Sequence, residues 1–88
     1  IRVAAHFDEG KRLYDEKKYE QARAHFEAAA KWRPAIGYLQ RVGWCLTQQG
    51  RFEEAVFPYS RAVRLAKGIK EVNWVAMEWV ESCISAGR

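Results

Sequence analysis

The chain has 88 residues, of which 49% are hydrophobic and 30% charged, and its net charge is +4. This balance excludes an intrinsically disordered chain, and the length allows a single domain, 1–88, with little room for an enclosed active site. No apolar run reaches the roughly 18 residues of a membrane span, and the mild positive charge slightly favours an acidic partner.

The first 35 residues predict two helices joined by the polar turn 15–18. One residue from each turn of the first helix lies on a shared stripe, with His6 as the weakest member. The stripe is Val3, His6, Gly10 and Leu13. The stripe of the second helix is Tyr19, Ala22, Phe26 and Ala29. Pro34 then ends that helix.

The next segment predicts a second pair of helices. The third helix has the stripe Leu39, Val42, Gly43 and Leu46. Gly50 suits the end of this helix, because glycine accepts the left-handed conformation of a helix C-cap. The fourth helix has the stripe Phe52, Ala55, Val56, Tyr59, Ala62 and Val63. Pro58 removes one backbone hydrogen bond there, and we expect a slight bend on the outer face, where His25 is its counterpart.

The remaining residues, 70–86, predict one further helix. Its apolar stripe is Val72, Val75, Ala76, Trp79, Val80 and Cys83. This helix is interpreted either as half of a third repeat or as a capping helix.

A shift of 33 residues superimposes the first pair of helices on the second. It aligns Gly10 with Gly43, Ala22 with Ala55, and Phe26 with Tyr59. Glycine inside a helix costs about 1 kcal/mol relative to alanine, so its recurrence needs a packing reason. We expect both glycines at helix crossings, with Ala22 and Ala55 as the opposing small residues.

These residues resemble the tetratricopeptide repeat, a helix–turn–helix of about 34 residues with the pattern W-x2-L-G-x2-Y, A-x3-F and P. The first unit matches at Gly10, Ala22, Phe26 and Pro34, and departs at His6, Glu9 and Leu13. The second unit matches at Gly43, Ala55 and Tyr59, and has Lys67 in place of Pro. The resemblance implies an all-α, right-handed solenoid of antiparallel helix pairs, with about five helices in units 3–35, 36–69 and 70–86.

The resemblance also implies that the first helix of each repeat lines a concave groove for an extended peptide or a partner helix. Helix geometry selects candidates independently, because at about 100° per residue Trp44 and Trp74 point away from their own apolar stripes. The candidate partner-binding residues on these sides are Phe7, Lys11, Tyr14, Gln40, Arg41, Trp44, Gln48, Trp74, Glu78 and Glu81.

Two interpretations of these aromatic side chains stay open. Either they are anchors for a partner, or they pack against a neighbouring helix of the solenoid. The charged residues beside them are interpreted as a solvated face. Family members that grip the carboxylate tails of chaperones use a Lys, Arg and Asn cluster. Phe7, Gln40 and Trp44 stand where that cluster would be completed, which argues against this subtype.

No arrangement of residues predicts catalysis, a metal or another cofactor. His6 and His25 have no partner at metal-ligand spacing, and neither cysteine has a CxxC neighbour. Adjacent acidic residues diverge on a helix, so the pairs Asp8-Glu9, Asp15-Glu16 and Glu53-Glu54 are expected to be solvated. We therefore predict a binding module rather than an enzyme, acting as a scaffold or a small chaperone.

Alternatives from other classes are weak nucleic-acid binding through the basic excess between Lys31 and Lys67, and structural self-association into a homo-oligomer. Cys45 and Cys83 are interpreted as buried free thiols in a reducing compartment, or less readily as a bridge. A reducing compartment favours a cytoplasmic location. The chain begins with Ile1 rather than Met, so we expect an excerpt of a longer protein.

Overall fold

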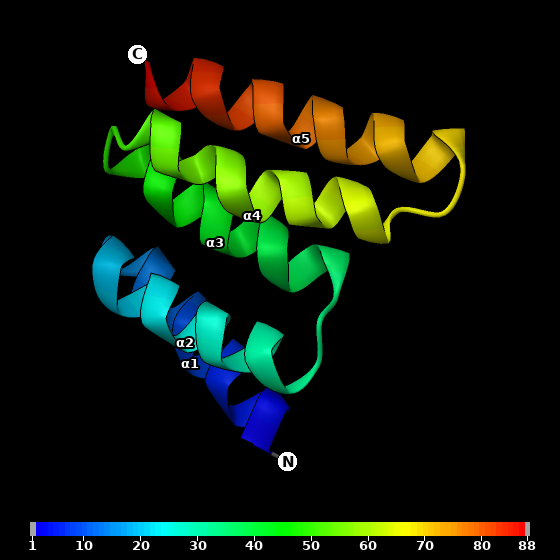
Figure 1. The fold of residues 1–88 in the computed structure, drawn as a ribbon. Coiled ribbons are helices and arrows are strands. Elements are labelled where there is room, and N and C mark those ends of the chain that lie inside the picture. The colour runs from blue at the N-terminus through cyan, green and yellow to red at the C-terminus, as the bar shows by residue number, and fades with distance from the viewer. Residues whose placement is uncertain (1, 88) are drawn as a thin grey trace.

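The computed structural model describes the backbone of residues 2–87 and the side chains of residues 5–87, and outside short turns this part of the chain is helical (Figure 1). The helices are α1 (Arg2–Asp15), α2 (Tyr19–Trp32), α3 (Ile36–Gln48), α4 (Phe52–Leu65) and α5 (Ile69–Ala86). Successive helices run antiparallel, and α5 closes one end of the stack (Figure 1). The predicted all-α solenoid is confirmed; Val3, placed on the first stripe, has its side chain outside the described part.

The turns that end α1 and α3 have the same hydrogen-bond pattern. Each contains one residue in the left-handed region, Lys17 with φ 64° and Gly50 with φ 75°. In both, the next N–H donates to a carbonyl five residues earlier over 2.9 Å, as in a Schellman motif. These bonds are Lys18 N to Leu13 O and Arg51 N to Leu46 O. The prediction for Gly50 is confirmed. Lys17 occupies the equivalent place, although a residue with a Cβ adopts the left-handed conformation less readily than glycine does.

An aromatic ring from the second helix of each pair lies on the glycine of the first. A Cβ atom built on Gly10 would lie 2.8 Å from Cε1 of Phe26, and one built on Gly43 would lie 2.6 Å from Cζ of Tyr59. Both separations are far below van der Waals contact, so only glycine lets the rings reach these positions. Phe26 and Tyr59 are fully buried, and the packing reason expected for the repeated glycine is confirmed.

The group that opposes each glycine is different from the one predicted. Ala22 and Ala55 are buried, but the glycines face the rings of Phe26 and Tyr59. Tyr59 is also fixed from its other side by α5. Its ring stacks on Trp79 with centroids 5.0 Å apart, and its hydroxyl lies 3.0 Å from Oγ of Ser82.

The apolar stripe predicted for α5 does not match its buried face. Val75 is fully buried and Trp79 is half-buried, whereas Val72, Ala76 and Val80 are exposed. The predicted stripe does consist of apolar side chains, but α3 and α4 cover only one edge of this apolar sector of the helix. The rest of that sector is left on the surface.

Predictions for three residues of α4 and one of α2 are also wrong. Phe52 and Val56 of the predicted stripe are exposed, because the stripe is wider than the surface that neighbouring helices cover. Pro58 is buried, and α4 continues through it. His25 lies against His6 of α1 rather than on an open outer face.

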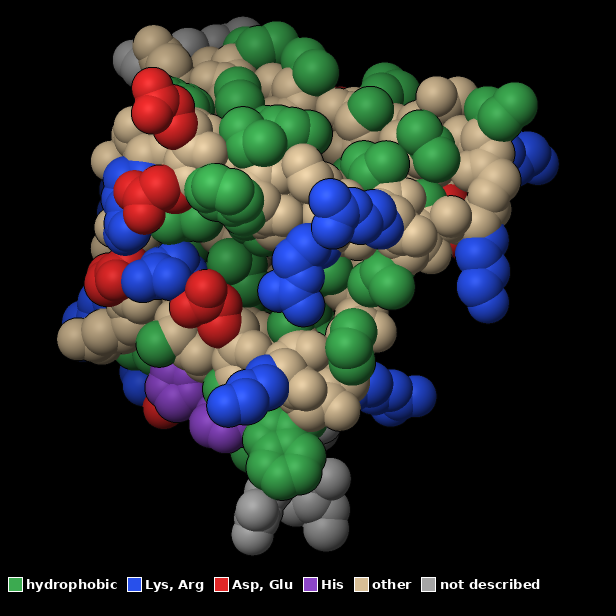
Figure 2. Space-filling view, in the orientation of Figure 1, with side chains coloured by type: hydrophobic (Ala, Val, Ile, Leu, Met, Phe, Trp, Pro, Cys, Tyr) green, Lys and Arg blue, Asp and Glu red, His purple; other side chains and the backbone are tan. Residues whose placement is uncertain are grey.

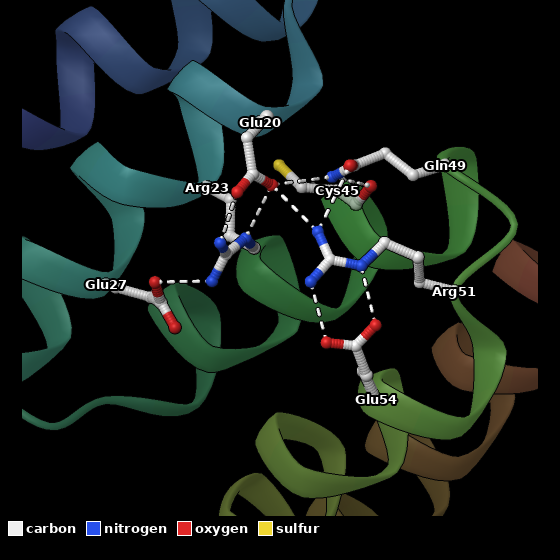
Figure 3. Close-up of polar contacts among 7 residues, drawn as sticks. All are labelled: Glu20, Arg23, Glu27, Cys45, Gln49, Arg51 and Glu54. Carbon is white, nitrogen blue, oxygen red and sulfur yellow. Dashed lines mark hydrogen bonds and ion pairs between the residues drawn. The ribbon is translucent and has the colours of Figure 1, made fainter.

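A polar network joins the first pair of helices to the second, near the start of α2 (Figure 3). Oε1 of Glu20 accepts hydrogen bonds from Nε of Arg23 at 2.9 Å, Nε2 of Gln49 at 3.2 Å and Nη1 of Arg51 at 2.9 Å. Arg51 also pairs with Glu54 at 2.6 Å. The bond with Arg23 comes first among the contacts that lower the pKa of Glu20 to about 2.

Gly43→Ala tests the contact between Tyr59 and the glycine. The added Cβ overlaps a ring that Trp79 and Ser82 hold in place, so we expect a loss of about 1–3 kcal/mol in the free energy of unfolding, measured by urea denaturation. Gly37→Ala is the matched control, because a Cβ there meets nothing within 4 Å. Equal stability of the two variants would contradict the packing account.

Glu20→Gln tests the network. The pKa of Glu20 is lower in the folded chain than in the unfolded one, so its contribution is fully present above about pH 5 and is lost as the pH falls toward about 2. The Glu20 side chain is 56% exposed, so screening limits this contribution to under about 1 kcal/mol.

Urea unfolding at a series of pH values measures the effect. The wild type should exceed Glu20→Gln in stability at neutral pH, and the two curves should converge in acid. Glu53→Gln, on an exposed glutamate with no ion pair among the described residues, is the control. A constant gap between wild type and Glu20→Gln from neutral to acid pH would count against the linkage.

Candidate functional site

The first helices of the pairs present aromatic side chains on one shared face. The rings of Phe7 in α1 and Tyr38 in α3 lie 5.1 Å apart between centroids, and those of Tyr14 and Trp44 lie 6.2 Å apart. These contacts arise because each Gly–aromatic crossing turns the opposite side of α1 and α3 away from α2 and α4. The result is an aromatic surface that continues onto α5.

Two hollows on this face meet at Trp44. One, of about 200 Å³, is lined by Phe7, Gly37, Gln40, Arg41, Trp44, Trp74 and Glu78. The other, of about 220 Å³, is lined by Tyr14, Trp44, Gln48, Glu81, Ser82 and Ser85. We call the two together the α1–α3–α5 groove. The hollows bring together nine of the ten candidate residues, and the tenth, Lys11, lies over the Phe7 ring with Nζ 5.5 Å from its centroid.

The aromatic candidates in the groove fit both interpretations left open by the sequence. Phe7, Tyr14 and Trp44 are half-buried and pack against the core, so part of each ring contacts neighbouring helices. Trp74 is 47% exposed. Each of these rings lines a hollow, and Trp74 has the largest surface left for a partner.

The charges in the groove are mixed in sign, and the cations lie over rings. The Arg41 guanidinium carbon is 5.2 Å from the Trp44 centroid and 5.9 Å from that of Phe7, distances at which a cation is attracted to a ring face. Glu78 lines the same hollow as Arg41. Burial raises the pKa of Tyr14 to about 12, so its hydroxyl remains protonated and can donate.

Two hydrogen-bond donors of the groove are buried without an acceptor. Gln40 is 5% exposed, and its Nε2 has no partner among the described residues. The indole Nε1 of Trp44 is also buried and has no acceptor among the described residues. A buried donor without an acceptor costs about 1–3 kcal/mol, and an acceptor from outside would relieve this cost if the two side chains turned toward the hollow that they line.

A hollow larger than either of these lies on the other side of the molecule and was not predicted. It has a volume of about 450 Å³ and is lined by residues of α2, α3 and α4, including Lys31, Arg61 and Phe57. Figure 2 views this side and shows Lys and Arg side chains beside hydrophobic ones at the middle of the molecule. Two sequence signals could have located it: the basic excess from Lys31 onward, and Phe57, which lies off the α4 stripe.

The two histidines contact one another, a contact that was not predicted from the sequence. Nδ1 of His6 and Nδ1 of His25 lie 3.1 Å apart, so one ring donates and the other accepts, and the tautomers must differ. No group of three or more His, Cys, Asp or Glu able to hold a metal occurs in the described part of the chain.

The acidic pairs lie at the surface, as expected, and three of their carboxylates also form ion pairs. Glu9 and Glu16 pair with Arg12, and Glu54 pairs with Arg51, all at the surface. These exposed pairs are worth little individually, and their cationic partners hold the carboxylates ionised. They therefore offer no raised-pKa carboxyl for acid–base chemistry.

Comparison with known protein families matches the chain to the family described as tetratricopeptide repeat, over residues 4–36 and again over 36–68. Searches among curated proteins and among solved structures return no match. Across residues 2–87, no helix is both long and apolar enough to cross a membrane.

The cysteines are free and differ in accessibility. Cys45 is fully buried, and Cys83 is half-buried, so the prediction of buried free thiols is confirmed for Cys45 and only partly for Cys83. Burial raises the pKa of Cys45 to about 12, so little thiolate is present there at neutral pH.

Thiol labelling tests this difference. With Ellman's reagent we expect Cys45, isolated in the Cys83→Ser variant, to react at least about a hundredfold more slowly in the native protein than in denaturant, because the reactive species is the thiolate. Cys83, isolated in Cys45→Ser, should react in the native protein. Equal native rates for the two thiols would contradict the burial of Cys45.

Proposed function

Because the chain belongs to the tetratricopeptide repeat family, we propose that the α1–α3–α5 groove binds an extended segment of a protein partner. Repeats of this family are generally protein–protein interaction modules, and the family is typically a non-enzymatic scaffold. The observation that supports the proposal is that Gln40 and Trp44 line a hollow walled by aromatic rings, while their buried Nε2 and Nε1 have no acceptor among the described residues.

The two donors need hydrogen-bond acceptors, which carbonyl oxygens of the partner's backbone would supply. An extended backbone offers one carbonyl per residue, and successive carbonyls point to opposite sides. A helix uses its carbonyls internally and leaves few for Gln40 and Trp44. The small size of the hollows, about 200 Å³ and about 220 Å³, also suits single side chains better than a helix lying in the groove.

The partner segment should carry an apolar or aromatic side chain. Trp74 and Phe7 wall the hollow and provide the surface on which such a side chain packs. Arg41 lies over two rings and shares the hollow with Glu78, so the groove has no cluster of free cations for a terminal carboxylate. An internal, apolar and largely uncharged segment fits this arrangement, whether the protein acts as a scaffold or as a chaperone.

Gln40→Met gives the sharpest test of the buried donors. It preserves volume and removes an amide that has no acceptor, so the free energy of unfolding should stay equal or rise. Affinity for the peptide should fall by about tenfold, since the partner's carbonyl then loses its donor. Trp74→Ala should weaken binding by about tenfold or more through loss of an aromatic contact.

The peptide is obtained by selecting a display library of random internal peptides against the wild-type protein, and its affinity is measured by calorimetry. Phe57→Ala is the matched control, because Phe57 is an exposed aromatic residue of the opposite hollow. Unchanged affinity in both Gln40→Met and Trp74→Ala would refute the groove, as would a requirement for a free terminal carboxylate.

A further inference from the structure

The outer face of α5 is the most extensive apolar surface on a single helix of the described chain. Its exposed fractions are 78% for Ile69, 62% for Met77, 56% for Val80 and 53% for Ile84, and Val72 is also exposed. Figure 2 shows hydrophobic side chains gathered along the upper part of the molecule, where α4 and α5 run. Contiguous apolar patches of this kind mark interaction surfaces on soluble proteins.

The repeat indicates that a helix fits this face. The 33-residue shift that relates the two pairs places Val72 at the position of Leu39 and Ala76 at the position of Gly43. In α3 that small residue receives the Tyr59 ring of α4. In α5 the equivalent Ala76 is exposed between larger apolar residues, so the face has the small central position at which another helix can approach closely.

The face is also nearly symmetric about Ala76. Ile69 and Ile84 stand at its two ends, and Val72 and Val80 stand inside them, each pair centred within one residue of Ala76. When two such helices pack antiparallel, each isoleucine meets the other copy's isoleucine and each valine meets a valine. We propose that a second copy of this chain covers the α5 face, in an antiparallel α5–α5 contact about a two-fold axis near Ala76.

Charge complementarity supports this occupant and this direction. Lys70 and Glu81 are eleven residues apart, or about three helical turns, so they lie on the same flank of α5 but too far apart to pair within it. Neither has an ion pair among the described residues. A two-fold axis near Ala76 brings Lys70 of each copy beside Glu81 of the other, and a closed interface of this kind is isologous.

Sedimentation of the protein over a wide concentration range tests the proposal. We expect a dimer, with dissociation raised at least about tenfold by Val80→Glu, which buries a charge at the centre of the contact. Phe57→Glu places the same charge on an exposed position of α4 that lines the hollow between α2, α3 and α4, outside the proposed contact, and should remain dimeric. Circular dichroism checks that both variants keep their helices.

A charge exchange tests the antiparallel direction. Lys70→Glu and Glu81→Lys should each weaken the dimer at low salt, and the double variant should restore it because the pair is re-formed with reversed signs. A wild-type monomer at all concentrations, or a dimer indifferent to Val80→Glu, would overturn the proposal. A double variant weaker than both single variants would overturn the antiparallel pairing.

Measuring the peptide affinity of Val80→Glu tests whether the α5 face and the groove are independent surfaces. Val80 lines neither hollow of the groove, so a monomeric variant that still binds the selected peptide supports two independent surfaces. Loss of peptide binding together with dimerisation would place the residue in one shared site and would overturn the separate α5 face.

Discussion

The fold depends on an aromatic ring pressed against a helix that has no side chain at that point. Phe26 lies on Gly10 and Tyr59 lies on Gly43, and each contact sets how closely the two helices of a pair approach. Since the rings fill that side of α1 and α3, the opposite sides are free to form the groove. Tyr59 extends the effect, because its stacking on Trp79 and its hydroxyl contact with Ser82 also position α5. The groove wall at Trp74 is therefore held through the same ring that closes the second pair.

Stability and the proposed peptide binding make opposite demands on α3. Its residues on one side are buried among apolar groups, whereas Gln40 and Trp44 keep donors without acceptors on the other. In a small domain, where total stability is only several kcal/mol, such donors are costly. The polar network around Glu20 offsets part of this loss by joining the pairs at the surface. Under the proposed peptide binding, the cost of these donors would be recovered when the partner supplies acceptors for them.

Periodicity and the 33-residue repeat were sufficient to predict the helices, their turns and the side of α3 that carries Trp44. They failed where the outcome depended on what covers a residue. Val72, Ala76 and Val80 lie on a correct apolar stripe, but no helix of the described chain packs over them. Pro58 is buried beside a hollow that residues of α2, α3 and α4 create together. His6 and His25 come together only after α1 and α2 pair. In each case the sequence records the chemistry of a side chain, whereas its surroundings depend on neighbours remote in the chain.

The position of α5 links the two surfaces proposed for this protein. Trp74, Glu78 and Glu81 line the groove from one flank of the helix, and Ile69, Val80 and Ile84 form the adjoining outer face. A two-fold axis perpendicular to α5 exchanges the ends of the helix but leaves each flank on its own side. The two grooves of an antiparallel dimer would consequently open on the same side of the assembly. Two segments of one partner could then bind together, and the second would bind at the high effective concentration set by the chain that links them. The self-complementary face of α5 would in this way strengthen a groove whose individual hollows are small.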